Sequence, residues 1–458
     1  APGLRSLTRE AWPCQRPRFH KHGQLCSCSA AQVVCLLPSW EGYAMRTAMT
    51  ASLLWLSLLL ACGASTEEPD AGVPCVGCPP CIGGDAPTEF EQTLLDLPPE
   101  RWFQAPGSSM RAVCVPDASG VRGVVGCPAV ISAWSGGAYD PVRRRMLIWG
   151  GGHNDYWGNE IYGFDLRTGS WSRVTEPSLI PDGTPSADFL NQDPLPDGQP
   201  VSRHSYDGVE FLADLDRLWA HGGSRASDGG GTSATWVFDA AGGWSQRAAG
   251  VGGYSLATAY DPASRQVLVN ASESLHVYDV DGDVWTALPG WGYPPLWPRY
   301  GGGDRTGVVD PRRGLYWTVG SGNILVWDIA GANAVTDDWV TVGGGAYSNA
   351  ERVGAYPEQV FESGGGDIYN VTAPGIDYDR AVDALVAWPN AGAPYALDLQ
   401  SKVWTPGSAI EAPVSANFSG TFGRWRYLEA YNVFLLVNSV DENVYFYKHT
   451  AGCGPPRQ

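Results

Sequence analysis

The stretch Tyr162-Gly163-Phe164-Asp165, followed six residues later by Trp171, recurs along this 458-residue chain and decides its fold. Each copy is a short apolar run that ends in Asp, passes through a polar turn and reaches a Trp. The other four copies end at Asp239, Asp279, Asp328 and Asp398, and their tryptophans are Trp244, Trp285, Trp339 and Trp404. Short apolar runs bounded by turn residues are typical of β-strands. The repeat therefore predicts a succession of short antiparallel strands.

A second motif lies upstream of most copies, where an apolar run ends in a turn of the Tyr-Asp-Pro type. It occurs as Ala138-Tyr139-Asp140-Pro141, Ala259-Tyr260-Asp261-Pro262 and Val309-Asp310-Pro311. Together the two motifs outline a four-stranded meander. Six such units begin near Ser132, Arg203, Tyr254, Thr306, Pro374 and Gly420. A period of this length indicates a repeat architecture, in which each unit buries its apolar face against the next.

The first unit carries a further signature, the glycine run Gly150-Gly151-Gly152 ahead of Asn159-Glu160-Ile161-Tyr162. With the Asp and Trp positions, this unit resembles the kelch repeat, which also builds the central domain of galactose oxidase-like proteins. The resemblance covers roughly residues 100 to 450 and implies an all-β fold, a β-propeller of six blades. It also implies that the Asp caps the turn after the third strand and that the Trp packs between neighbouring blades.

The sixth unit ends before any outer strand with a Trp. Residues 97–103, which contain Trp102, precede the first unit and would supply that strand. The two ends of the propeller would then close the ring in one blade. Closure matters because an open propeller leaves an unpaired sheet edge. A seventh blade is the alternative if residues 345–372 hide a degenerate unit.

The composition agrees with a turn-rich β protein. Aromatic residues make up 11% of the chain and charged residues 17%, and there are 58 Gly and 35 Pro. This balance excludes a helical bundle. The formal net charge is −18, so a broad basic surface for nucleic acid or an anionic membrane is absent. We expect no nucleic-acid partner, no cofactor and a monomeric chain.

The N-terminal part is expected to lie outside the fold. Residues 1–44 show no periodicity and are interpreted as an upstream extension. Residues 45–61 have a basic start and an apolar core too short to span a bilayer, which is typical of a secretory signal. The sequence Leu59-Leu60-Ala61-Cys62 resembles a bacterial lipobox, which implies that Cys62 is lipidated. An ordinary secretory signal with an incidental Cys62 is the alternative.

Residues 62–95 are polar, rich in Gly and Pro, and read as a flexible tether ahead of a propeller over residues 96–453. Removal of residues 1–61 would leave 24 Lys and Arg against 46 Asp and Glu, a net charge of −22. The lipobox resemblance predicts a bacterial cell-envelope lipoprotein at the outer membrane, in contact with the membrane through its lipid alone.

Six cysteines follow Cys62, and an even number in an exported chain favours disulfides. We expect Cys114 to pair with Cys127, and Cys453 to pair with one tether cysteine. The tether cysteines are Cys75, Cys78 and Cys81. Their spacing also fits a metal cluster, but an oxidising compartment and the lack of a nearby His disfavour it. We predict no metal site.

Candidate site residues gather where loops of neighbouring units should meet at one end of the propeller. His153 and His204 come from adjacent units, and with Tyr206 they are the candidate catalytic residues. The candidate substrate-binding residues are Asn154, Arg203, His221, Arg225, Arg305, Arg424, Arg426 and Tyr427. A structural role is the alternative for the histidines and arginines, whose hydrogen bonds could fix interblade loops or the channel wall.

Two propeller families offer comparisons for the chemistry. Copper radical oxidases need a Tyr-linked Cys and a late pair of His, whereas this chain has no Cys between Cys127 and Cys453. Such an oxidase is therefore not expected. Ulvan lyase-like polysaccharide lyases combine His, Tyr and Arg from neighbouring blades, and the candidate site is similar in residue types. In uronate β-elimination Arg would neutralise the carboxylate, while His and Tyr would act as base and acid.

Three functions remain open from the sequence. The first is a carbohydrate-directed enzyme, with a polysaccharide lyase acting on a uronate-containing glycan as the preferred form. The second is a non-catalytic module that binds a glycan or a protein, and the third is a structural envelope protein. The negative net charge opposes a long polyanionic substrate unless arginines make the channel locally positive. A polysaccharide or cell-surface glycan is the expected partner.

Overall fold

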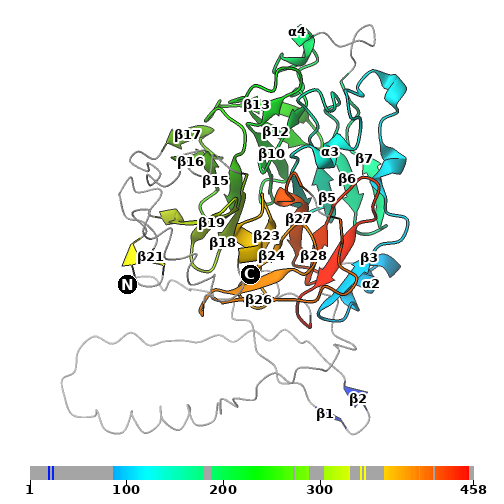
Figure 1. Ribbon diagram of the computed structural model, residues 1–458, viewed down its shortest axis with the longest axis vertical. Coiled ribbons are helices and arrows are strands. Elements are labelled where there is room, and N and C mark those ends of the chain that lie inside the picture. Colours follow the sequence, from blue (N-terminus) through cyan, green and yellow to red (C-terminus); the bar gives the residue numbers. More distant parts are fainter. Residues whose placement is uncertain are drawn as a thin grey trace, which may run out of the picture. The chain divides into compact units, whose positions relative to one another are not determined.

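The computed structural model describes residues 86–178, 187–271, 274–287, 304–330, 366–401, 403–415 and 418–452. It also describes two short antiparallel pairs, β1 (Phe19–His20) with β2 (Gly23–Gln24), and β21 (Thr341–Val342) with β22 (Gly345–Ala346). The chain divides into two compact units, Ala1–Pro80 and Cys81–Gln458. The β1–β2 pair belongs to the first unit, and the second unit contains the main fold (Figure 1).

Six antiparallel sheets form the blades of a β-propeller. The first contains β4 (Gly137–Asp140), β5 (Arg145–Ile148), β6 (Tyr162–Asp165) and β7 (Ser170–Arg173). The second contains β9 (Val209–Leu212), β10 (Arg217–His221), β12 (Thr235–Asp239) and β13 (Gly243–Arg247). The third contains β14 (Ala257–Asp261), β15 (Gln266–Ala271), β16 (Ser274–Asp279) and β17 (Val284–Ala287).

The remaining three blades complete the ring. Three strands of the fourth are described, β18 (Thr306–Asp310), β19 (Leu315–Gly320) and β20 (Asn323–Asp328). The fifth contains β23 (Gly375–Asp379), β24 (Ala384–Trp388), β25 (Tyr395–Asp398) and β26 (Val403–Pro406). The sixth contains β27 (Trp425–Leu428), β28 (Val433–Leu436), β29 (Tyr445–Lys448) and, from the other end of the domain, β3 (Arg101–Gln104).

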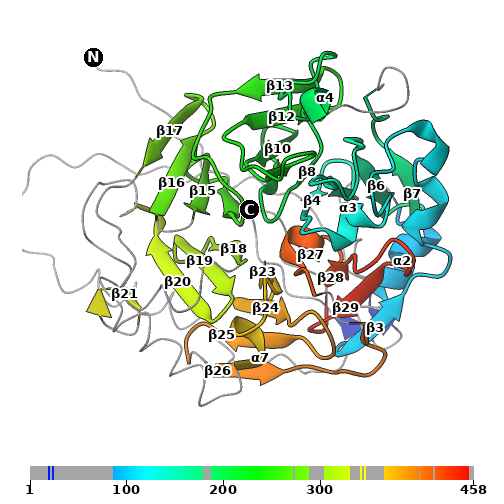
Figure 2. The same ribbon diagram turned by 45° about the horizontal axis from the view of Figure 1, so that its top comes forward.

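The ring is closed at the centre and at its edge. The inner strands β4, β9, β14, β18, β23 and β27 each contact the next, and β27 contacts β4 again. Figure 2 shows the sheets arranged around this common centre. At the outer edge β3 pairs with β29, which places Trp102 opposite Tyr447. The prediction of six blades closed by an N-terminal strand is therefore confirmed.

Aspartates end the strands by capping the turns that follow them. Oδ1 of Asp165 accepts a hydrogen bond from the backbone N–H of Arg167 at 2.6 Å, after the third strand of its blade. Asp140, at the end of an inner strand, accepts from the N–H groups of Val142 (3.0 Å) and Arg143 (2.9 Å). These bonds satisfy turn donors that would otherwise lack a partner. The repeated Asp is thus a turn-forming residue.

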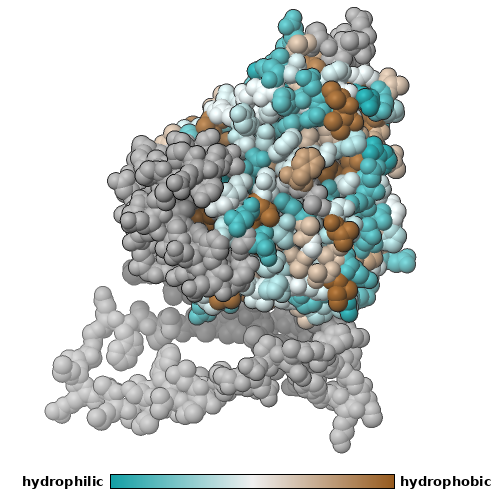
Figure 3. Space-filling model, viewed as in Figure 1, coloured by the Kyte–Doolittle hydropathy of each residue, from teal (hydrophilic) through white to brown (hydrophobic). Residues whose placement is uncertain are grey.

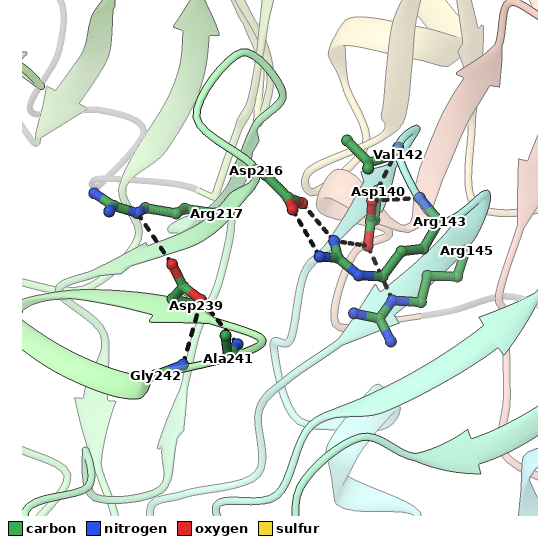
Figure 4. Close-up of polar contacts among 9 residues, drawn as sticks. All are labelled: Asp140, Val142, Arg143, Arg145, Asp216, Arg217, Asp239, Ala241 and Gly242. Carbon is green, nitrogen blue, oxygen red and sulfur yellow. Dashed lines mark hydrogen bonds and ion pairs between the residues drawn. The ribbon is translucent and has the colours of Figure 1, made fainter.

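Ion pairs join the inner hairpin turns of neighbouring blades. Arg143, from the first blade, bonds to Asp140 of its own turn and to Asp216 of the second blade (Figure 4). Other blade boundaries have Asp214 with Arg265, Arg313 with Asp383, and Arg380 with Glu429. Partly exposed pairs contribute little energy singly. They recur at four blade boundaries and so join neighbouring blades at this end of the propeller.

The repeat tryptophans pack in the apolar layers of the blades. The ring of Trp244, in the second blade, lies 5.2 Å from that of Trp149 in the first and 5.4 Å from that of Phe238. Trp171 lies 5.3 Å from Phe164, and its indole N–H donates to the carbonyl of Ser108. Trp244 thus packs between neighbouring blades, as the repeat predicts. Trp339 lies outside the described residues.

The segment between β3 and β4 is irregular and contains η1 (Met110–Val113), η2 (Asp117–Ser119) and α3 (Ala129–Ser132). It carries the predicted disulfide between Cys114 and Cys127, with Cα atoms 5.9 Å apart. The other described helices are α2 (Glu89–Leu95), α4 (Ala187–Leu190), α7 (Gly366–Tyr369) and η5 (Phe422–Arg424). Across the described ranges, no helix is long and apolar enough to cross a membrane. The predicted roles of Cys62, Cys75, Cys78, Cys81 and Cys453 fall outside those ranges.

Candidate functional site

The segments that lead into the inner strands lie at one end of the propeller, opposite the inner hairpin turns. Five of them pass through a non-glycine residue with a left-handed backbone, at φ between 35 and 59°. These residues are Trp134, Tyr206, Ser255, Ala373 and Phe422. Such angles are unfavourable for residues with a Cβ, and they occur also in the inner hairpin turns at the other end, for example at Arg144 and Asp216. We call this end, defined by these five residues, the mouth.

Aromatic rings from several blades are in contact across the mouth. Trp134 stacks on His204 with ring centroids 5.3 Å apart, and Tyr206 lies 6.2 Å from Tyr254 and 6.0 Å from Phe422. The cluster begins at Phe418, which is 77% exposed, and ends at Tyr254, which is 54% exposed. We call the following set the aromatic cluster: Trp134, His204, Tyr206, Tyr254, Phe418 and Phe422. It is a supported platform with two exposed ends.

His153 and His204 lie together at the mouth. Their rings meet edge to face with centroids 5.4 Å apart, where His153 is exposed and His204 is buried. Nε2 of His204 lies 2.9 Å from Oδ2 of Asp155. Burial lowers the pKa of His204, and the hydrogen bond and negative charge of Asp155 oppose that shift. Sequence reasoning did not select Asp155, although it follows His153 by two residues.

The turn that carries His153 is held tightly against the second blade. A Cβ added to Gly152 would lie 2.3 Å from the Cα of Arg203, in the short strand β8 (Arg203–His204). Only a glycine allows this approach. The backbone N–H of His153 also donates to the carbonyl of Arg225 at 3.2 Å, in β11 (Ser224–Arg225). The glycine run thus brings the His153 turn into contact with the strand that carries His204.

Asp304, just before β18, brings a carboxylate to the mouth. Burial raises the pKa of this carboxyl group, and the polar groups of the Ser255 and Trp134 side chains oppose that rise. Burial, together with the nearby charge of Asp304, raises the pKa of Tyr206, which therefore keeps its proton at neutral pH. Asp304 has no sequence motif around it, and only the folded chain reveals its place.

Three of the predicted arginines bond to groups other than the aromatic cluster. Arg203 is buried and donates to two backbone carbonyls and to Asp193, the last at 2.8 Å. Arg424 is buried and donates to three backbone carbonyls. Arg225 donates to Asp228 at 2.6 Å and to a backbone carbonyl. These contacts match the structural alternative, in which the arginines fix loops and the channel wall.

The other predicted binding residues are spread through the fold. His221 is buried between a threonine hydroxyl and a backbone carbonyl, and burial lowers its pKa to about 3. The hydroxyl of Tyr427 lies 2.9 Å from Oδ1 of Asn432. Arg305 is buried just before β18. Asn154 is exposed beside His153, so it is the member of this group that lies next to the histidine pair.

Arg426 belongs to a buried polar cluster at the inner strands, which we call the channel cluster: Asp207, Glu210, Asp377 and Arg426. Nη2 of Arg426 lies 3.4 Å from both carboxylate oxygens of Glu210. Burial raises the pKa of Glu210 to about 7 and raises those of Asp207 and Asp377, while Arg426 opposes each rise. One arginine thus faces three carboxyl groups, which favours retention of protons.

Comparisons with known proteins do not assign the site. No family model matches the sequence, and no curated protein matches it. Among solved structures, a chain of the nidogen/laminin complex is similar with 11% sequence identity and a TM-score of 0.34, covering 61% of this chain and 80% of that chain. The assignment of the propeller rests on the strand pairing described above. Within the described residues, no group of three or more His, Cys, Asp or Glu could hold a metal ion.

Proposed function

We propose that the protein binds a glycan at the mouth, through the aromatic cluster. The observation that carries this proposal is the exposure of Phe418 and Tyr254 at the two ends of a run of contacting rings. Sugar rings present apolar C–H faces, and aromatic side chains held by their neighbours offer a matching surface with little rotamer freedom to lose. His153, Asp155 and Asp304 supply polar groups for the hydroxyls, as ligand sites require.

The charges around the aromatic cluster favour a neutral glycan over a polyanion. Asp155 and Asp304 are acidic, and the guanidinium groups of Arg203, Arg225 and Arg424 bond to other groups. The chain as a whole carries a net charge of −18. A polyanion would have to approach against this field. Neutral polysaccharides are therefore the first ligands to test.

A polysaccharide lyase is the second candidate, because His153 and His204 are in contact and Asp155 bonds to His204. In this proposal His153 removes the C5 proton of a uronate, the C4–O bond breaks as the C4–C5 double bond forms, and protonated Tyr206 donates to the departing oxygen. The three arginines above do not supply the positive charge that this reaction needs at the carboxylate. The lyase therefore ranks behind the binding module.

Affinity measurements on soluble neutral polysaccharides, such as a β-glucan and a mannan, test the binding proposal. Tyr254→Ala and Phe418→Ala should each weaken binding by about tenfold, because each removes an exposed ring from the platform. Val284→Ala, in the outer strand β17, is the matched control, since Val284 is 53% exposed and lies away from the mouth. Unchanged affinity in the Tyr254→Ala, Phe418→Ala double variant would refute the proposal.

Uronate polysaccharides such as alginate and pectin distinguish the lyase. Formation of an unsaturated product, seen as new ultraviolet absorbance, would establish β-elimination. Turnover should then be abolished by His153→Ala and by Tyr206→Phe while ligand binding persists. If no uronate polysaccharide yields the product and a neutral glycan binds, the non-catalytic binding module is favoured.

We further propose that the protein is a lipid-anchored component of a bacterial cell envelope. The support is the order of basic residue, apolar core and Leu59-Leu60-Ala61-Cys62 in the sequence. Replacement of Cys62 by Ser should release the protein from membranes in a fractionation assay. Membrane association that persists unchanged in this variant would contradict the anchor.

A further inference from the structure

We propose that the disulfide loop, residues 114–127 closed by Cys114 and Cys127, positions the pair formed by His204 and Asp155. The geometry at the mouth would then depend on a covalent link that lies outside the mouth itself. The effect on ligand affinity rests on the proposed function, whereas the effect on His204 does not.

The loop holds the backbone of the Asp155 turn directly. The N–H of Val124 donates to the carbonyl of Asn154 at 2.7 Å, and those of Val125 and Gly126 donate to the carbonyl of Asp155 at 2.9 and 3.0 Å. Three successive donors of the loop thus face two successive carbonyls of the turn. The orientation of the Asp155 carboxylate toward His204 is set by a backbone that this loop fixes.

A glycine makes this contact close. A Cβ added to Gly123, at φ +64°, would lie 2.6 Å from the carbonyl oxygen of Asn154 and 2.7 Å from that of Asp155. Real Cβ atoms do not come so near to backbone oxygens, so any larger residue must push the turn away. The backbone N–H of Trp157, beyond the turn, donates in return to the carbonyl of Val121 at 2.9 Å.

The loop also reaches His204 from its other side. Cys127 stands at the start of α3, where its carbonyl accepts a hydrogen bond from the N–H of Val130 at 3.0 Å. The buried helix α3 leads within two residues to Trp134, which stacks on His204 at an interplanar angle of 28°. One end of the disulfide therefore anchors the residue above His204, and the loop before it anchors the carboxylate beside His204.

The loop is anchored by its disulfide and by Val115 and Val121, which are buried in the hydrophobic core, while its tip is exposed. Val124 and Val125, at its tip, are 69% and 42% exposed, and the ion pair between Arg122 and Asp117 is on the surface. A cross-link that closes a short loop restricts its alternative conformations. The disulfide is therefore a covalent restraint, added to the packing of Val115 and Val121, on the segment that contacts the Asp155 turn.

The titration of His204, followed by its imidazole signals in NMR, tests the proposal without any ligand. Asp155→Asn should lower the pKa of His204, because the carboxylate raises it in the native protein. The double variant Cys114→Ser, Cys127→Ser should shift the pKa in the same direction. Amide exchange at Val124 and Val125 should become about tenfold faster, since their bonds to the turn open more often.

A pair of glycine variants separates positioning from general stability. Gly123→Ala retains the disulfide but displaces the Asp155 turn, so it should also lower the pKa of His204. Gly107→Ala is the control: its φ is +72° and an added Cβ would meet nothing within 4 Å, so the backbone strain is alike and the mouth is untouched. The control should leave the His204 titration unchanged.

The outcomes are distinct from those of the glycan experiments. The proposal is overturned if folded Cys114→Ser, Cys127→Ser protein and Gly123→Ala protein both titrate at His204 as the wild type does, or with a raised pKa. If the disulfide variant does not fold, Gly123→Ala alone decides. If the variants change the pKa of His204 but the wild-type protein binds no glycan, the positioning role of the loop is supported and the proposed function is refuted.

Discussion

Asp140 is fully buried at the end of β4, and nearly all of its hydrogen-bonding capacity is used inside its own turn. Oδ1 accepts from the N–H groups of Val142 and Arg143, and Oδ2 lies 3.0 Å from Nε of Arg145 (Figure 4). A buried carboxylate of this kind is stable because charged and backbone donors replace its water. Its removal would leave those donors unsatisfied.

Asp140→Ala should therefore lower the free energy of unfolding by about 2–4 kcal/mol, measured by chemical denaturation. Asp165→Ala is the comparison, because Asp165 caps an equivalent turn at the surface side of the blade and accepts from one N–H there. That variant should lose about 0.5–2 kcal/mol. Equal losses of unfolding free energy in the two variants would show that the burial of Asp140 adds nothing to stability.

The mouth shows which single residues could be predicted from the sequence. His153, His204 and Tyr206 were predicted to meet because adjacent repeat units must place equivalent loops side by side, and their rings are in contact. Asp304 could not be selected, because its partners are set by the spatial order of the blades. Arg203 was selected for its charge, but a sequence does not reveal which carbonyls a guanidinium will reach.

The strand β3 closes the propeller because its aromatic residue fits the last blade. Trp102 is 2% exposed, and its ring lies 5.1 Å from Tyr447 and 5.8 Å from Trp425. Its indole N–H donates to the carbonyl of Ser408 at 3.0 Å. One residue thus joins the N-terminal strand to the sixth blade and to the segment that follows the fifth.

Trp102→Ala should lower the free energy of unfolding by about 3–5 kcal/mol, because it removes a large side chain from the closing blade. Trp102→Phe keeps an aromatic ring and loses the bond to Ser408, so its effect should be smaller, about 1–2 kcal/mol. Thermal and chemical unfolding of both variants provide the measurement. A loss below about 1 kcal/mol for Trp102→Ala would mean that β3 is not needed for closure.

Blade strands could be predicted because each depends on a local pattern that repeats. Tyr162, Phe164 and Trp171 show this pattern within ten residues. The irregular segment between β3 and β4 does not follow the strand pattern of the repeat, so its contacts with the Asp155 turn could not be predicted from a period. Its disulfide between Cys114 and Cys127 was predicted, because an even number of cysteines in an exported chain favours disulfides.

The channel cluster connects blades around the whole axis. Asp207 accepts from the backbone N–H groups of Thr258 and Gly307, at 3.0 and 2.7 Å, and Arg426 reaches Glu210 from the sixth blade. These contacts link the second blade to the third, fourth and sixth. The stability of the entire ring is therefore coupled to the protonation of groups at its centre.

The direction of that coupling follows from the pKa of Glu210. Burial raises it to about 7 in the folded protein, whereas the pKa of a Glu side chain in an unfolded chain is about 4.3. Between these two pKa values the folded state holds a proton that the unfolded chain has released. The stabilisation by Glu210 is therefore complete below the pKa of the unfolded chain, and it is lost as pH rises through the pKa of the folded protein. Burial shifts the pKa of Asp207 and Asp377 in the same direction. His221 acts oppositely, because burial lowers its pKa to about 3.

Comparison of variants at matched pH isolates the channel acid from His221. Glu210→Gln cannot release a proton, so relative to the wild type it should gain stability as pH rises from 5 to 8, by on the order of 3 kcal/mol. The buried His221 is present in both proteins and cancels in the difference. Glu89→Gln, at an exposed position in the first turn of α2, is the control for the loss of a carboxylate at the surface. The difference between Glu210→Gln and wild type could instead be constant from pH 5 to 8. Glu210 would then stay ionised in the folded protein over this range. The channel cluster would be a fixed ion pair, and closure of the propeller would not depend on pH.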